Sequence, residues 1–171
     1  MSKLFVDEIQ PKTTGGIINT KGHIIQIDNV TSFVSTTGTT TMPFDDTIPQ
    51  NNEGNEFLTL AFTPTSATNK LYINVHGHWG STATNSWLTM ALFQDNMANA
   101  IAVSTAFDSI ANGCLNHGLT HFMTAGTTSE TTFKVRVGRN GSSTVRMNGT
   151  DGARFFGGVL GSGITIMEIG V

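Results

Sequence analysis

Two histidines are the first residues whose types and spacing suggest chemistry: His76 and His78 lie two positions apart in an alternating apolar and polar segment. In a β-strand such residues point to the same side and lie roughly 6 to 7 Å apart, so a third ligand would complete a metal site. No Cys or His follows at the spacing of a known metal motif. We therefore interpret the pair as polar residues of a strand and predict no bound metal.

Other nucleophilic or basic residues lack the spacing that catalysis needs. His117 and His121 are four residues apart, which fits one face of a helix but separates them by roughly 13 Å along the strand expected here. Cys114 has no acid or base beside it, and free cysteines usually behave as small buried hydrophobes. The glycine-rich segment 157–163 has no lysine and no following helix, so it does not predict a phosphate-binding loop. No cofactor is expected.

Carboxylates and serines lead to the same conclusion. Asp45, Asp46, Glu53 and Glu56 offer oxygens for calcium, but not at the regular spacing of a calcium loop. No serine lies in a G-x-S-x-G nucleophile elbow. No pair of carboxylates can be assigned the separation of a glycosidase site from the sequence. We expect a protein that is not an enzyme, with no catalytic residues.

The elements that must position any site are strands, because apolar and polar residues alternate with a period of two. The alternation is clearest in the segments 57–62, 70–76 and 133–137. Asn-Gly and Asp-Gly pairs after residue 139 mark tight turns, and no segment shows the period of an amphipathic helix. About eight to ten strands are expected at the spacing of a sandwich. The pattern predicts an all-β fold, a jelly-roll-like antiparallel β-sandwich.

The composition of the 171 residues supports this fold and limits the partners. The chain has 27 threonines, 19 glycines and 14 asparagines, and only 12% of its residues are charged. A net charge of −3 gives no basic surface for nucleic acid, and no apolar run reaches the roughly 20 residues of a membrane span. The N-terminus does not have the pattern of a signal peptide. Few charges favour a homo-oligomer, because interface centres are depleted of charge.

Several segments carry a resemblance to a known family. They are TIPQNNEGNEF (47–57), TPTSATNKLYINV (63–75), ALFQD (91–95), MTAGTTSETTFKVRVG (123–138) and GSGITIMEI (161–169). In this order they resemble the C-terminal domains of bacteriophage tail-fibre and related virion surface proteins. That family has a trimeric jelly roll similar to C1q and tumour-necrosis-factor heads. The resemblance implies a virion structural protein and brings no catalytic motif with it.

Two expected strands are apolar on both faces, which suggests a second partner surface. In a two-layer sandwich one face of each strand meets water, yet the segments 87–93 and 164–169 carry apolar residues on both faces. A trimer axis is the natural candidate, and in a trimer the histidine pair would also occur three times, which leaves a symmetric ion site open. The trimer-interface residues expected on this basis are Trp87, Ala91, Phe93, Ile164, Ile166 and Ile169.

The first 27 residues are expected to form an arm, and residues 28–171 the sandwich. Apolar residues alternate in the first ten positions, where Leu4, Phe5, Val6 and Ile9 are the expected attachment residues. One interpretation makes this segment the first strand of the core sheet. The other makes it an arm that docks on a neighbouring subunit or on another virion protein. The flexible joint at Gly15–Gly16 favours docking.

Two tryptophans, Trp79 and Trp87, flank the polar loop 80–85. Exposed tryptophans near such loops stack on sugar rings, which would suit contact with a host surface glycan. A position in the core or in a trimer interface is the favoured alternative.

The leading hypothesis is a non-enzymatic phage structural protein, made in the host cytoplasm and displayed on the virion surface. Its expected partners are itself, as a homotrimer, and other virion proteins, either the capsid or the base of the tail or fibre. A short fibre or appendage and a capsid decoration protein are the two placements. The alternative function is a glycan-binding fibre tip or lectin-like module.

Overall fold

The computed structural model describes residues 21–150 and 152–171, and in these ranges the regular elements are strands with one short 3₁₀ turn. The strands of the first half are β1 (Ile24–Ser32), β2 (Thr37–Gly38), β3 (Asn55–Phe62), β4 (Lys70–Ser81), β5 (Ser86–Gln94) and β6 (Ala102–Asp108). Those of the second half are β7 (Cys114–Thr124), β8 (Thr131–Arg139), β9 (Val145–Met147), β10 (Gly149–Thr150), β11 (Ala153–Arg154) and β12 (Ser162–Ile169), with the 3₁₀ turn η1 (Phe156–Gly158). The all-β prediction is confirmed.

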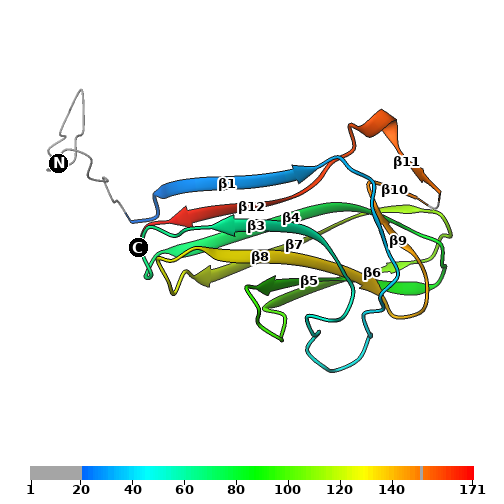
Figure 1. Cartoon of the computed structure of the whole chain (residues 1–171), viewed down its shortest axis with the longest axis horizontal. Helices are drawn as coiled ribbons and strands as arrows, with labels where there is room; N and C mark the ends of the chain where they lie inside the picture. Colours follow the sequence, from blue (N-terminus) through cyan, green and yellow to red (C-terminus); the bar gives the residue numbers. More distant parts are fainter. Residues whose placement is uncertain (1–20, 151) are drawn as a thin grey trace, which may run out of the picture.

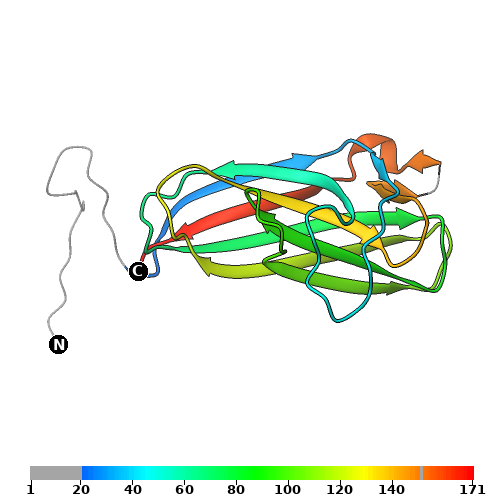
Figure 2. The ribbon, with the colours of Figure 1, turned by 60° about the horizontal axis from the view of Figure 1, so that its bottom comes forward.

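The strands form two main antiparallel sheets that face each other. The larger sheet has the order β1-β12-β4-β9-β2, with β7 paired to the other edge of β4, and the smaller sheet has the order β3-β8-β5-β6. Most neighbours in the two sheets are far apart in sequence, as in β1 with β12 and β3 with β8, which is the winding of a jelly roll. Figures 1 and 2 show the two layers as an elongated sandwich with the C-terminus at one end. The predicted jelly-roll-like β-sandwich is confirmed.

The core lies between the two sheets because one alternating set of apolar residues on each main strand turns inward. On β4, Leu71, Ile73 and Val75 are buried, and on β3 the inward set begins with Leu58 and Leu60. The polar residues between them point outward, so one period-two pattern places both the core and the solvent face.

A buried carboxylate fastens the loop between β3 and β4 to the end of the sandwich. Glu168 of β12 accepts hydrogen bonds on Oε1 from the Thr65 hydroxyl at 2.8 Å, the Ser66 N–H at 3.2 Å and the Asn69 side chain at 2.7 Å. Its Oε2 accepts from Gln26 of β1 at 2.7 Å. Burial raises the pKa of Glu168, but these hydrogen bonds outweigh burial and hold the pKa below its ordinary value of 4.5.

The strand expected to be apolar on both faces, β5, is covered by its own chain. Met42, from the connection between β2 and β3, packs with Ala91 and Phe93 on the outer side of β5, and all three are buried. The Met42 N–H also donates to the Arg139 carbonyl at 2.8 Å, which holds the connection across the smaller sheet. The second apolar face of β5 is therefore covered by Met42 of the same chain.

The expected interface residues of β12 divide between core and surface. Ile164 and Ile166 point into the core and are 0% exposed. Ile169 is half-buried on the opposite side, where it pairs with Ile24 and Lys70. With Ala91 and Phe93, four of the six expected residues are thus inaccessible in one chain, because the core and the connection 39–54 cover them.

The expected boundary at residue 27 falls inside β1. The Gly22 N–H donates to the Gly170 carbonyl at 2.8 Å, and β1 pairs with β12 from Ile24 onward. The expected attachment residues Leu4, Phe5, Val6 and Ile9 lie outside the described residues. Within the described ranges, no helix has the length and apolar character needed to cross a membrane.

Candidate functional site: an aromatic groove on the smaller sheet

Three aromatic side chains gather on the outer face of the smaller sheet. Phe44 stacks on Trp87 with ring centroids 4.4 Å apart and planes 4° apart. Phe107 packs edge-on against Trp87, with ring centroids 5.1 Å apart. Trp87 and Phe107 are brought together because they are direct cross-strand partners in the β5–β6 register. Phe44 arrives from the connection between β2 and β3.

An open groove of about 380 Å³ begins at Phe44 and continues between this connection and the outer face of β5 and β6. Its volume lies within the range of small-ligand sites. The residues that define it are Phe44, Ile48, Thr89, Ile101, Val103 and Thr105. Ile48 and Val103 are exposed, although both are large and apolar. The groove is therefore an accessible site with one aromatic and several aliphatic walls.

The polar groups of the groove are hydroxyls and one carboxylate. Thr89 and Thr105 face each other across the strands, with 3.3 Å between their hydroxyl oxygens. The Thr105 hydroxyl donates to the Leu88 carbonyl at 3.1 Å, so it remains an acceptor toward the groove. At the rim, the hydroxyl and the N–H of Thr47 donate to Asp45 Oδ1 and lower the pKa of that carboxyl.

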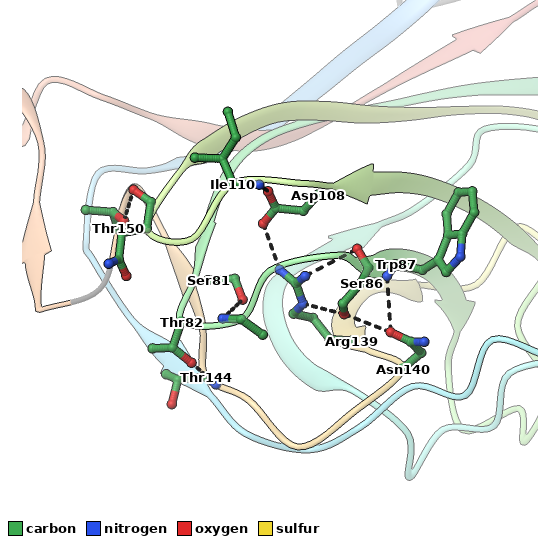
Figure 3. A network of polar contacts seen from close by, with 12 residues as sticks. Ser81, Thr82, Ser86, Trp87, Asp108, Ile110, Arg139, Asn140, Thr144 and Thr150 are labelled. Carbon is green, nitrogen blue, oxygen red and sulfur yellow. Dashed lines mark hydrogen bonds and ion pairs between the residues drawn. The ribbon is translucent and has the colours of Figure 1, made fainter.

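A polar network that is buried at Arg139 and Asp108 and exposed at Asn140 holds the start of β5, where Trp87 lies (Figure 3). Arg139 donates from Nη1 to Asp108 Oδ2 at 2.8 Å, from Nε to the Ser86 hydroxyl at 2.8 Å and from Nη2 to the Ser86 carbonyl at 3.2 Å. Asn140 accepts the Trp87 N–H at 3.1 Å and the Ser86 hydroxyl at 2.8 Å. The backbone of Trp87 is thus positioned from beneath by an ion pair and an amide.

The two predicted tryptophans occupy opposite environments. Trp79 is 0% exposed and packs edge-on against Phe57, with centroids 5.1 Å apart, so its ring cannot contact a glycan. Trp87 is half-buried in the aromatic cluster. Trp79 is therefore a core residue. A contact with a glycan stays a hypothesis only for the aromatic cluster around Trp87.

The histidines and the cysteine do not form a reactive site. His76 and His78 both lie on the outer face of β4, and partial burial together with the nearby His76 lowers the pKa of His78. Burial raises the pKa of the Cys114 thiol, which disfavours the reactive thiolate. Within residues 21–150 and 152–171, no three His, Cys, Asp or Glu side chains lie close enough together to hold a metal.

Sequence reasoning missed Phe44, Ile48, Val103 and Phe107 as surface residues. A signal was present in β6, where Val103, Thr105 and Phe107 alternate with small residues and all face outward. The period-two pattern identifies such a face, but it does not show that the connection 39–54 crosses it and turns it into a groove.

A second exposed apolar surface lies on the larger sheet. Ile27, Met167, Tyr72 and Phe122 are successive partners across β1, β12, β4 and β7, so they form one row on the outer face. Ile27 is 55% exposed and Phe122 is 56% exposed. We call these four residues the apolar row.

No protein-family model and no curated protein matches this sequence. Among solved structures, the chain is similar to a protein of infectious bursal disease virus, Gt strain, with 9% identity, a TM-score of 0.45, and coverage of 98% of this chain and 42% of that one. The protein of T=1 particles derived from infectious bursal virus has 7% identity and a TM-score of 0.41, and the match covers 98% of this chain and 41% of that one. The insecticidal delta-endotoxin Cry8Ea1 from Bacillus thuringiensis has 9% identity and a TM-score of 0.39, and the match covers 83% of this chain and 20% of that one. The chain spans less than half the length of each, and these values are too low to indicate a shared function.

Proposed function

We propose that this chain is a non-enzymatic structural protein of a bacteriophage virion, displayed on the particle surface as a homotrimer. The sequence resemblance to phage surface proteins supports the virion role. The observation that carries the proposal is the apolar row, because Ile27 and Phe122 are more than half exposed in a single chain. Exposed apolar rows of this kind on a sheet face mark contact surfaces between proteins.

The surroundings of the apolar row suit a partner without charge. The next row across the same strands consists of Asn29, Thr165, Asn74 and Thr120, which are all uncharged. Two pairs within it are already hydrogen-bonded, with Asn29 donating to the Thr165 hydroxyl at 2.9 Å and Asn74 to the Thr120 hydroxyl at 3.2 Å. The row on the other side of the apolar row contains Ile169 and Lys70, and Lys70 donates to the Thr124 hydroxyl, so a charged residue borders this face. A surface with so few charges is typical of interface centres and needs no oppositely charged partner, so another copy of the chain fits it.

The extent of this face is of the same order as that of a specific interface. Four strands spaced about 4.8 Å apart, each about eight residues long at about 3.3 Å per residue, present roughly 500 Å² in projection. A specific interface buries about 800 Å² of accessible surface per partner. Accessible surface follows the contours of the side chains, so for the same face it is larger than the projected area. In a trimer the contact is heterologous, so this face of one copy meets a different surface of the next.

The N-terminal segment supplies attachment in this proposal. Residues before β1 form an arm that docks on the capsid or on the base of a tail or fibre, and the sandwich begins with β1. Extended segments bind sheet edges through main-chain hydrogen bonds, with alternate side chains in pockets. Leu4, Phe5, Val6 and Ile9 are the alternating side chains proposed for this role.

Light scattering on the full chain tests the trimer. The expected mass is three times the 18.2 kDa of one chain. Phe122→Lys should reduce it to the monomer, because three buried lysines would be placed in a desolvated interface without partners. Val159→Lys is the matched control, since Val159 is 78% exposed and lies outside the larger sheet. A monomeric wild-type protein, or a trimeric Phe122→Lys variant, would contradict the proposed interface.

Labelling of particles tests the virion role. Antibodies against the folded sandwich should bind intact particles at regular positions on the head or at the tail. The labelled position also separates a capsid decoration from a short fibre. Particles that contain no copy of the chain by mass spectrometry would exclude the role.

A further inference from the structure

We propose that the groove beside Phe44 binds a neutral sugar residue of a surface polysaccharide. This site lies on the smaller sheet, on the opposite side of the sandwich from the apolar row. It does not depend on trimer formation or on attachment to a particle.

The aromatic wall of the groove has one free face. Phe44 and Trp87 cover each other because their planes are parallel and only 4.4 Å apart. Phe44 nevertheless remains 50% exposed, so its other side is open to a ligand. Sugar rings present C–H groups on one face that pack against an aromatic ring, while their hydroxyls remain free to form hydrogen bonds.

The floor and rim of the groove supply acceptors for those hydroxyls. The Thr105 hydroxyl donates a hydrogen bond to the Leu88 carbonyl and accepts one from the Thr89 hydroxyl, which leaves one lone pair on its oxygen for a ligand. Asp45 uses Oδ1 for Thr47, and no described residue donates to its Oδ2. A few placed polar groups in an otherwise apolar groove are the usual design of a small-ligand site.

The charge of the lining selects among ligands. Of the lining residues only Asp45 carries a charge, and none is a lysine or arginine. A phosphorylated or carboxylated sugar would face this carboxylate without a compensating cation, so it is disfavoured. The hydroxyls and the single acceptor match a neutral saccharide.

The site is held in shape before any ligand arrives. Met42 is buried against β5, and Gly54 donates its N–H to the Thr41 carbonyl at 2.8 Å, so both ends of the connection 39–54 are fastened. Arg139 and Asn140 position the backbone of Ser86 and Trp87 beneath the aromatic cluster. Preorganisation of this kind reduces the ordering cost of binding.

Intrinsic fluorescence provides a direct test on the full chain. Trp79 is 0% exposed in the core, whereas Trp87 stacks on the Phe44 ring that lines the groove, so a change on titration reports the groove. The probes are cellopentaose, maltopentaose and mannopentaose, with a hyaluronan oligosaccharide as the anionic counterpart. We expect a saturable change with at least one neutral probe and none with the anionic one. Absence of saturation up to about 20 mM, well above a millimolar Kd, would overturn the proposal.

Variants assign the binding to the groove. Phe44→Ala should weaken the affinity at least about tenfold, which corresponds to about 1.4 kcal/mol. Phe33→Ala, at a phenylalanine of similar accessibility in the connection between β1 and β2, should leave it unchanged. Phe44→Leu retains apolar packing without an aromatic face, and the same loss is expected there even if the alanine variant folds poorly. Equal binding by Phe44→Leu and wild type would overturn the site.

Asp45→Asn separates neutral from cationic ligands. The amide oxygen can still accept hydrogen bonds, so a neutral saccharide should lose no more than about threefold in affinity, since this substitution keeps an acceptor in place. A loss of binding in this variant, or stronger binding of an amino sugar than of its neutral analogue, would show a cation site instead. Binding of an apolar peptide or of a second copy in preference to every saccharide would also contradict the assignment.

Discussion

Arg139 and Asp108 form an ion pair of 2.8 Å between β8 and the end of β6, and their side chains are 0% and 3% exposed. The pair joins two strands that are not neighbours in the smaller sheet, because β5 lies between them. The same guanidinium reaches Ser86 at the start of β5. Three strands are therefore tied together directly beneath the aromatic cluster.

Loss of one partner of this pair should be strongly destabilising. Asp108→Asn leaves the Arg139 charge buried without a counter-charge, and such changes cost about 3 to 5 kcal/mol. The control is Glu56→Gln, because Glu56 and Arg136 are 3.8 Å apart and partly exposed, and such pairs contribute about 1 kcal/mol or less. Denaturant unfolding of both variants measures the difference. Equal effects would show that the buried pair has no special role.

Glu168 should make the stability depend on pH in the acid range. The pKa of Glu168 is lower in the folded protein than its ordinary value of 4.5, so its stabilising effect is fully present above pH 4.5. It is lost as the pH falls from 4.5 through the folded pKa, because the unfolded chain takes up the proton first. Glu168→Gln should cost about 2 to 3 kcal/mol at neutral pH, and the difference from wild type should shrink in acid.

The control for this pH dependence is Glu130→Gln, because Glu130 is an exposed carboxylate in the connection between β7 and β8. Thermal or denaturant unfolding at a series of pH values gives the comparison. A constant difference between wild type and Glu168→Gln from pH 7 down to about pH 3 would contradict the role assigned to the hydrogen bonds around Glu168.

The sequence predicts the sandwich well because burial and the period-two pattern coincide. Leu71, Ile73 and Val75 alternate with polar residues, and each one is buried in the core. The same pattern is ambiguous when both faces are apolar. Ala91 and Phe93 suggested a partner subunit, but Met42 covers them from a connection whose path no local pattern encodes.

The two tryptophans illustrate the second ambiguity. Trp79 and Trp87 both lie in strands that the alternating pattern predicts. The alternation alone does not tell which of the two is buried. A clue lay beside Trp79, since a side chain at Gly77 would collide with its indole ring. Small residues next to a large one indicate a ring packed flat along the strand. The surface position of Trp87 depends on its long-range partners Phe44 and Phe107, which become neighbours only in the folded sheet.

The arm is tested by two deletions that end on either side of β1. Removal of residues 2–16 leaves the Gly22–Gly170 hydrogen bond and all of β1 in place. The sandwich should then keep its melting temperature within a few degrees, because the contacts among residues 21–150 and 152–171 are unchanged. The truncated protein should fail to attach to particles, because the docking segment is missing. Removal of residues 2–32 also strips β1 from β12 and exposes the edge of β12.

This longer deletion should lower the melting temperature by many degrees. In a domain of this size each kcal/mol of lost stability lowers the midpoint by roughly 2 to 4 °C, and the loss of β1 is expected to cost several kcal/mol. Calorimetry and light scattering give the stability and oligomeric state of both proteins, and co-sedimentation with particles gives attachment. If the protein lacking residues 2–16 still decorates particles at normal occupancy, attachment belongs to the sandwich. If its melting temperature falls as far as that of the longer deletion, the N-terminal segment is part of the folded body and is not a docking arm.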